Sequence, residues 1–380
     1  MRVLMTGGGT AGHINPALAI ADTIKEKNPD AEILFVGAKG RMETTLVPAA
    51  GYPIKTVDVR GFQRRLSLKN IGRNVSAAVH AVTAGGACVR ILKEFRPDIA
   101  IGTGGYVSGP ILRKAAAMGI PVLVHESNAY PGVTVKMLAK VASAVMLCDE
   151  SAKKYLPEGC RTVVTGNPLR PAFRRMDAAA RERAREELGV DDRPLILSFG
   201  GSLGAGRIND AMADVLARSH RQGKLQHIHG TGKAGWESFC ALMAERGVPL
   251  DKEGIHVREY IDDMPRCMAA ADLVICRCGA MTLSELPAAG KPSILIPSPN
   301  VAENHQYHNA MALVRRGAAV CMQEKELSSD ALWDAVQKIV FSPSALREMG
   351  ENAQKTAILD ADERIYRVVE QTLQTASAKK

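Results

Sequence analysis

The sequence predicts an α/β protein with two Rossmann-like domains, each built on a doubly wound parallel sheet. Short β-rich runs alternate with helix-forming segments along most of the chain, which is the pattern of parallel sheets covered by helices. A strand, a glycine-rich turn and a helix follow one another at the N-terminus, and the same series begins again at residue 195. The chain has 380 residues, enough for two domains with separate cores.

The first half of the chain supplies the elements of the first predicted domain, residues 1–165. Apolar runs predict strands at residues 2–5, 32–36, 98–101 and 122–125. Helical spacing of apolar residues predicts helices at residues 16–27 and 111–118.

The alternation breaks at residues 165–175, where the run TGNPLRPAF carries two prolines and a glycine. We interpret this stretch, with the charged helix 178–188 after it, as the start of a second domain spanning residues 166–361. The elements predicted in that domain are a helix at 207–217 and strands at 195–199, 227–229, 256–259, 273–276 and 293–296. A last helix, residues 362–380, has an apolar face and is expected to pack back on the first domain.

The bulk composition narrows the class of protein. No apolar run approaches the roughly 18 residues that span a bilayer, and the N-terminus lacks the features of a signal peptide, so a cytoplasmic protein is expected. The eight cysteines are scattered and predict neither a disulfide framework nor a zinc site. A net charge of +9 without a nucleic-acid motif suits phosphate-bearing ligands or an anionic membrane face.

The first glycine-rich turn contains Gly7-x-Gly9-x-x-Gly12, which matches the dinucleotide fingerprint in its spacing. A nicotinamide site also needs an acidic residue at the end of the second strand, where it holds the ribose. That strand ends in Gly37 and Ala38, and Glu32 stands at its opposite end. The turn is therefore either a tight strand-to-helix connection or a loop adapted to other chemistry.

Two further loops and one acidic residue are candidates for ligand binding. The loops at residues 102–110 and 200–206 follow predicted strands, and ligands of doubly wound sheets bind at that edge, here in a cleft between two domains. Ser202 adds a hydroxyl to the backbone N–H groups of the second loop, which make an anion site. Glu285 lies in a short helix after a glycine turn, where a carboxylate can accept two hydrogen bonds from the diol of a ribose.

Seven motifs taken together resemble the MurG family across essentially the whole chain. They occur in the family's order and spacing and read GGGTAGHINPALAIA, GGYVSGP, HESNAYPG, TGNPLR, GGSLGA, EYIDDM and GAMTLSELPAAGKPSILIP. The resemblance implies the GT-B fold and an inverting transfer of N-acetylglucosamine from UDP-N-acetylglucosamine to the muramoyl C4 hydroxyl of lipid I, forming lipid II. It also implies a peripheral protein on the cytoplasmic face of the cell membrane, with no cofactor and no metal.

The resemblance also implies roles for individual residues. His13 would be the general base, since a helix N-terminus favours the neutral imidazole. Residues near the acceptor sugar would be Thr10, Ala11, Gly12 and Asn128. Residues around the donor would be Arg170 and Ser202 on the diphosphate, Ile261 on the uracil, Ala280, Met281, Thr282, Leu283, Ser284 and Glu285 around the nucleotide, and Gln306 on the sugar hydroxyls. The chain departs from many members at Ala11, Ser127 and His305. Asp360-Ala361-Asp362 is interpreted as a helix start and not as a metal motif.

One basic and apolar stretch, residues 61–73, is a candidate membrane contact. The residues that would touch an anionic surface are Phe62, Arg64, Arg65, Leu66, Leu68 and Lys69. The alternative is a solvated loop followed by an ordinary helix.

The expected partners are UDP-N-acetylglucosamine, lipid I, the anionic membrane surface and the cell-wall synthesis machinery, with no nucleic acid. Three other functions stay open from the residues alone: a UDP-N-acetylglucosamine epimerase, a nicotinamide oxidoreductase and a non-catalytic nucleotide-sugar sensor.

Overall fold

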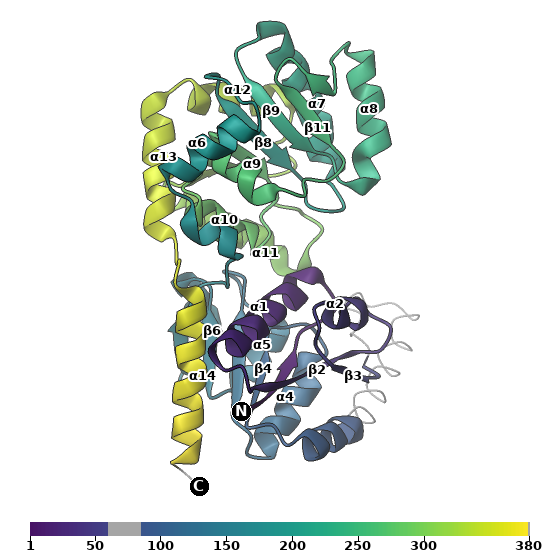
Figure 1. Cartoon of the computed structure of the whole chain (residues 1–380), viewed down its shortest axis with the longest axis vertical. Helices are drawn as coiled ribbons and strands as arrows, with labels where there is room; N and C mark the ends of the chain where they lie inside the picture. The colour runs from purple at the N-terminus through teal and green to yellow at the C-terminus, as the bar shows by residue number, and fades with distance from the viewer. Residues whose placement is uncertain (60–84, 379–380) are drawn as a thin grey trace. The chain divides into compact units, whose positions relative to one another are not determined.

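The computed structural model describes residues 1–59 and 85–378, and the chain divides into two compact units (Figure 1). Unit 1 comprises Met1–Pro168 and Asp360–Lys380, and unit 2 comprises Leu169–Leu359. The six residues proposed for the membrane contact, Phe62, Arg64, Arg65, Leu66, Leu68 and Lys69, lie outside the described residues. Within the described part of the chain, no helix has the length and apolar character needed to cross a bilayer.

Unit 1 is built on a seven-stranded parallel sheet with the order β3-β2-β1-β4-β5-β6-β7. Its strands are β1 (Arg2–Thr6), β2 (Glu32–Ala38), β3 (Ile54–Val57), β4 (Ile99–Gly102), β5 (Val122–Glu126), β6 (Ala144–Leu147) and β7 (Thr162–Val164). The central strands are buried along their whole length, as expected for a sheet covered by helices on both faces. This explains their nearly continuous apolar sequences.

The helices of unit 1 form the two covering layers. They are α1 (Ala11–Lys27), α2 (Glu43–Ala49), a helix over residues 85–95, α4 (Ser108–Ala117), α5 (Val133–Leu138), the 3₁₀ turn η1 (Glu150–Tyr155) and α14 (Ala361–Ser377). The prediction that the first helix starts at Pro16 is wrong, because α1 begins at Ala11 and carries Pro16 in its interior. The early start places the first turn of α1 directly after the glycine-rich turn.

The last helix of the chain belongs to the core of unit 1. Ile365, Val368 and Val369 are buried with residues of α1 and of the sheet, and Thr23 of α1 donates a hydrogen bond to Asp362 at 3.3 Å. Lys27 of α1 pairs with Glu363 at the surface. Figure 1 shows α14, in yellow, running beside α1 and β6.

Unit 2 repeats the arrangement with a sheet in the order β10-β11-β9-β8-β12-β13-β14. Its strands are β8 (Leu195–Phe199), β9 (Gln226–Gly230), β10 (Asp251–Lys252), β11 (Ile255–Arg258), β12 (Leu273–Cys276), β13 (Ser293–Leu295) and β14 (Ala319–Cys321). Only β10 runs antiparallel to its neighbour among these described strands. Its helices are α6 (Ala178–Glu187), α7 (Gly206–Gln222), α8 (Trp236–Glu245), α9 (Met264–Ala270), α10 (Thr282–Ala288), α11 (His305–Val314), α12 (Ser329–Val340) and α13 (Pro343–Thr356). Four short 3₁₀ turns complete the described elements, η1 in unit 1 and η2 (Pro171–Arg175), η3 (Lys233–Gly235) and η4 (Ala302–Asn304) in unit 2.

Both sheets reverse their winding at one point. In unit 1 the direction changes between β1 and β4, and in unit 2 between β8 and β12. At such a switch point the loops that follow the two central strands diverge, and the crevice they leave is the usual ligand site of this architecture. The predicted fold class of two doubly wound parallel sheets is confirmed, and the fold places the glycine-rich segments at these switch points.

Candidate functional site

The switch point of unit 1 is occupied by His13. Its Nδ1 atom lies 3.2 Å from the carbonyl oxygen of Gly8 and 3.3 Å from the hydroxyl of Thr10. From the loop after β4, Thr103 donates a hydrogen bond of 2.6 Å to the backbone carbonyl of His13. A side chain at Gly104 would meet the imidazole, because an added Cβ would stand 2.8 Å from Cδ2. Two loops that are distant in sequence therefore hold this half-buried ring in one position.

The other acceptor candidates lie in unit 1 at the same edge of its sheet. Thr10, Ala11 and Gly12 are exposed at the start of α1, where Thr10 is the N-cap in extended conformation. Asn128 follows β5 and is fixed by Glu126, whose Oε1 accepts from the Asn128 backbone N–H at 2.8 Å and from its amide at 3.0 Å. Burial raises the pKa of Glu126, against the lowering effect of these bonds.

Sequence reasoning missed Glu43, the first residue of α2. Its side chain is fully buried, and its two carboxylate oxygens accept the backbone N–H groups of Gly9 and Ala38, each at 3.0 Å. The search for an acid at the end of β2 stopped at Ala38, whereas the chain returns to that point five residues later. A buried carboxylate does stand there, and it binds the protein backbone.

The switch point of unit 2 contains a pocket of about 180 Å³ at the carboxyl ends of β8, β9 and β11, closed by α10, which follows β12. Its lining includes five of the predicted donor residues, namely Arg170, Ser202, Ile261, Thr282 and Glu285. The remaining wall comes from Phe199, Gly201, Gly230, Gly232, Glu259, Tyr260, Asp262 and Met264. Residues that are spread over more than a hundred positions in the sequence thus converge on one hollow.

Arg170 and Glu285 form an ion pair in this pocket. The Arg170 Nε and one terminal nitrogen lie 2.9 and 2.8 Å from the same Glu285 oxygen, Oε1. The Glu285 side chain is 7% exposed and the Arg170 side chain 51%, so the pair has one buried and one solvated partner. Burial raises the pKa of Glu285, and the Arg170 charge opposes that rise. The two residues that the resemblance assigns to different parts of the donor are bound to each other here.

The loop before α7 has the form of an anion site. Gly201 and Gly204 have φ of +94° and +83°, and a Cβ on Gly204 would stand 2.2 Å from the carbonyl oxygen of Thr231. α7 begins at Gly206 without a side-chain cap and without an acid in its first turn. The positive end of its dipole therefore suits an anionic ligand.

The other predicted donor residues have distinct surroundings. Ala280 and Met281 are partly exposed at the start of α10, whereas the Leu283 side chain packs into the core of unit 2. The Ser284 hydroxyl donates to the carbonyl of Ala280 at 3.3 Å. The Gln306 side-chain oxygen accepts the N–H groups of Cys278 and Ser298, at 3.3 and 2.9 Å, and so ties two loops together.

The Asp-Ala-Asp sequence has structural partners on both sides. Asp360 is the N-cap residue of α14, its carboxylate accepts from Arg364 at 2.9 Å, and Asp362 accepts from Thr23. Among the residues that the structure describes, no group of three or more His, Cys, Asp or Glu side chains could hold a metal ion.

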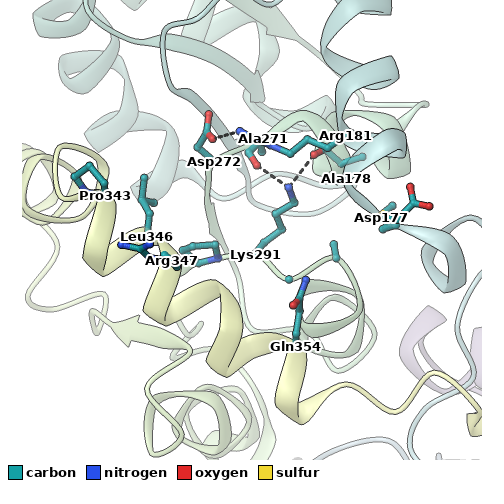
Figure 2. A pocket seen from close by; sticks show the side chains of 15 residues that line it. Asp177, Ala178, Arg181, Ala271, Asp272, Lys291, Pro343, Leu346, Arg347 and Gln354 are labelled. Carbon is teal, nitrogen blue, oxygen red and sulfur yellow. Dashed lines mark hydrogen bonds and ion pairs between the residues drawn. The ribbon is translucent and has the colours of Figure 1, made fainter.

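A second and larger hollow in unit 2 surrounds Lys291 (Figure 2). Lys291 donates hydrogen bonds of 2.8 Å to the carbonyls of Ala269 and Ala271, at the end of α9, and Arg181 pairs with Asp272. Burial lowers the pKa of Lys291 to about 7, helped by the charges of Arg181 and Arg185 and opposed by Asp272. These cations already have protein partners, so the hollow is a structural cap of α9 and a poor candidate for the substrate site.

Comparisons with known proteins agree along the whole chain. Residues 3–147 match the glycosyltransferase family 28 N-terminal domain, and residues 195–365 match the C-terminal domain of the same family. A UDP-N-acetylglucosamine–N-acetylmuramyl-(pentapeptide) pyrophosphoryl-undecaprenol N-acetylglucosamine transferase of Acetivibrio thermocellus is 44% identical over 380 residues, which is 100% of both chains. The protein of the same name from Ruminiclostridium cellulolyticum is 42% identical over 98% of this chain and 100% of its own.

Solved structures extend the comparison to the fold. Acinetobacter baumannii MurG superposes with a TM-score of 0.79 at 29% identity, over 97% of this chain and 99% of that one. A UDP-GlcNAc 2-epimerase from Neisseria meningitidis bound to UDP-GlcNAc gives a TM-score of 0.65 at 14% identity, over 99% and 100% of the two chains. At that identity the second likeness concerns the fold alone.

Proposed function

The chain belongs to the MurG family of glycosyltransferases, and we propose that it transfers N-acetylglucosamine from UDP-N-acetylglucosamine to the C4 hydroxyl of the muramoyl sugar of lipid I, forming lipid II. The observation that carries this function is the identity of 44% over full length with a transferase of that name. The epimerase alternative has weaker support, since it rests on a structure that is 14% identical. Peptidoglycan synthesis is the process to which the enzyme contributes.

We propose that unit 2 binds the donor. The diphosphate would lie on the loop before α7 and on Ser202, and its negative charge would attract the half-exposed guanidinium of Arg170. When Arg170 turns toward the diphosphate, Glu285 Oε1 loses its partner and can accept the ribose hydroxyls instead. The donor therefore replaces one ion pair with two separate charge-assisted contacts.

The other predicted contacts complete the donor site. The backbone of Ile261 would contact the uracil, because its side chain is packed against Gly230. The nucleotide would be enclosed by Ala280, Met281, Thr282, Leu283 and Ser284, with Leu283 limited to its backbone. The amide nitrogen of Gln306 would reach the sugar hydroxyls while its oxygen holds the two loops.

We propose that His13 of unit 1 is the general base. Its imidazole would remove the proton from the muramoyl C4 hydroxyl as that oxygen attacks the anomeric carbon, and UDP would leave from the opposite face. The inversion from α to β follows from this single displacement. Thr10, Ala11, Gly12 and Asn128 would line the acceptor sugar. The charge on the departing UDP would be stabilised by Arg170 and the α7 N-terminus, without a metal.

We also propose that the enzyme works at the membrane surface. Because lipid I is carried on a lipid, the enzyme would work as a peripheral protein at the cytoplasmic face of the membrane. Residues 61–73 would provide the contact with the anionic surface, where each basic residue is worth about 1 kcal/mol. Proteins of the cell-wall synthesis machinery are the further partners we propose, with roles in cell shape and division.

The test is incubation with UDP-N-acetylglucosamine and a short-chain lipid I analogue. A product with one added β-linked N-acetylglucosamine and one UDP released is the expected result. A donor-only reaction that yields an isomeric sugar would favour the epimerase, and donor binding without turnover would favour the sensor. If an absorbance titration shows that the protein binds NADH, the nicotinamide oxidoreductase would be favoured.

A further inference from the structure

A single peptide group connects the buried carboxylate of Glu43 to His13. The N–H of Gly9 donates to Glu43 Oε2 at 3.0 Å, and the carbonyl of Gly8 lies 3.2 Å from His13 Nδ1. This N–H and this carbonyl are the two ends of the peptide group between Gly8 and Gly9. We infer that Glu43 is a positioning residue, which acts through this peptide to keep the proton of the neutral His13 ring on Nδ1. The inference rests on the proposed role of His13 as the base.

The direction of each hydrogen bond follows from the chemistry of its groups. An ionised carboxylate only accepts, a backbone N–H only donates, and a backbone carbonyl only accepts. His13 must therefore supply the hydrogen that lies between Nδ1 and the Gly8 carbonyl. The Thr10 hydroxyl, 3.3 Å from Nδ1, can accept from the same N–H. In the neutral ring the lone pair then stands on Nε2, which is the atom that would take the proton of the acceptor hydroxyl.

Burial strengthens the electrostatic effect of the Glu43 carboxylate on the Gly8–Gly9 peptide and, through it, on His13. Glu43 is fully buried, and its charge acts with little screening by water. A carboxylate that binds the Gly9 N–H polarises the peptide and increases the negative charge on the Gly8 oxygen. The imidazolium that forms on proton transfer is stabilised by that oxygen. Tyr106 and Arg41 are titratable groups near the carboxylate, since both Arg41 and Glu43 act on the pKa of Tyr106, which burial raises.

The space that Glu43 occupies explains one glycine of the turn, Gly8, and one glycine of β2, Gly37. A Cβ on Gly8 would stand 2.3 Å from Glu43 Oε1, and a Cβ on Gly37 would stand 2.6 Å from its Cγ. On the other side, a Cβ on Gly105 would stand 2.2 Å from the Gly8 carbonyl. Gly8 and Gly105, in the loops after β1 and β4, and Gly37, near the end of β2, thus make room for one carboxylate and one peptide. Of the glycines in the dinucleotide-like spacing, Gly9 takes part in this arrangement through its backbone N–H.

The first measurement needs no change in the Glu43 site. With ¹⁵N-histidine labelling, the neutral His13 ring should show a protonated Nδ1 and an unprotonated Nε2, and the H13A variant assigns the signals. A neutral ring protonated on Nε2 would overturn the inference. This result concerns only the ring, so it stands whether or not His13 proves to be the base.

The second measurement compares kinetics in two backgrounds. E43Q removes the charge while keeping the side-chain shape, and kcat should fall about 10- to 100-fold, as when a partner that orients a histidine is removed. The donor KM should stay within about threefold. In the H13A background E43Q should have almost no further effect, because the group it positions is gone. D362N, at another buried carboxylate of unit 1, is the matched control and should leave kcat and the His13 spectrum unchanged.

The outcomes separate the two hypotheses. An equal loss of kcat from E43Q with and without His13 would show that Glu43 only supports the loop, which overturns the inference. If H13A itself keeps normal kcat, the proposed base is wrong, while the ¹⁵N spectrum still decides whether Glu43 fixes the ring. If E43Q does not fold, the spectrum of the unchanged protein decides alone.

Discussion

Replacing Lys291 with methionine should change how the stability of unit 2 depends on pH. Lys291 is 7% exposed and donates to the carbonyls of Ala269 and Ala271, each at 2.8 Å. A neutral amine has two N–H groups, which is the number that these two carbonyls require. Lys291→Met keeps a similar chain length and removes both the hydrogen bonds and the titrating group.

The expected sign follows from the two pKa values. Burial lowers the pKa of Lys291 to about 7 in the folded protein, from an ordinary value of 10.5. Between these values the unfolded chain binds one more proton than the native chain, so the free energy of unfolding rises with pH. The penalty of charging the buried amine is present in full below pH 7 and is relieved above it. From pH 7 to pH 9 the gain is about 2 kcal/mol, since the native amine is half titrated at pH 7.

Urea unfolding followed by tryptophan fluorescence measures this gain. The chain has two tryptophans, Trp236 and Trp333, and both lie in unit 2, so the signal reports that unit. The unfolding free energy of the parent minus that of Lys291→Met should increase by about 2 kcal/mol between pH 7 and pH 9. Lys338→Met, at an exposed lysine of the same unit, should show no such increase. A difference that stays flat or falls over this range would refute the reasoning and show that the ammonium is the native form.

Four further outcomes test the proposed chemistry. His13→Ala should lower kcat by about 10²–10⁴-fold with little change in donor KM, and near-normal steady-state turnover would remove His13 from the mechanism. Glu285→Ala should raise the donor KM and reduce discrimination against 2′- and 3′-deoxy UDP in competition assays, because a diol acceptor is lost; unchanged discrimination would place the ribose elsewhere. EDTA should leave the initial rate largely intact, and a strict need for Mg²⁺ would contradict leaving-group stabilisation by Arg170 and the α7 N-terminus. Changing Arg64, Arg65 and Lys69 together to serine should weaken salt-sensitive co-sedimentation with anionic vesicles while preserving activity on a soluble acceptor; parent-like sedimentation would exclude this segment as the contact.

Strands were the part of the fold that could be predicted best. β8 and β12 begin and end where the apolar runs predict, because both are buried on both faces and every residue of the run is constrained. Helix ends were harder. α7 continues to Gln222, well past the last predicted residue, Ala217, because its final turn is polar and the helix stops only at Gly223, with φ of +66°.

The candidate site shows a similar division. Loops that follow strands could be placed at the sheet edge from topology alone, and unit 2 does bring Arg170, Ser202 and Glu285 to one pocket. The ion pair between Arg170 and Glu285 could not be foreseen, because it joins residues 115 positions apart whose partners are set by packing. Glu43 was missed for a related reason, since a helix returns it to a strand end that the local sequence leaves without an acid.

The position of α14 in the chain determines the order in which the two units can complete their folding during synthesis. Ile365, Val368 and Val369 complete the core of unit 1, yet the whole of unit 2, Leu169–Leu359, is translated before them. At about 5–20 residues per second, the apolar surface that α14 covers stays open for roughly 10–40 s on the ribosome. The second unit can finish folding first, and the first unit closes only after α14 has been translated. A chain cut short after Leu359 would therefore carry a complete unit 2 joined to a unit 1 whose core lacks the apolar face of α14.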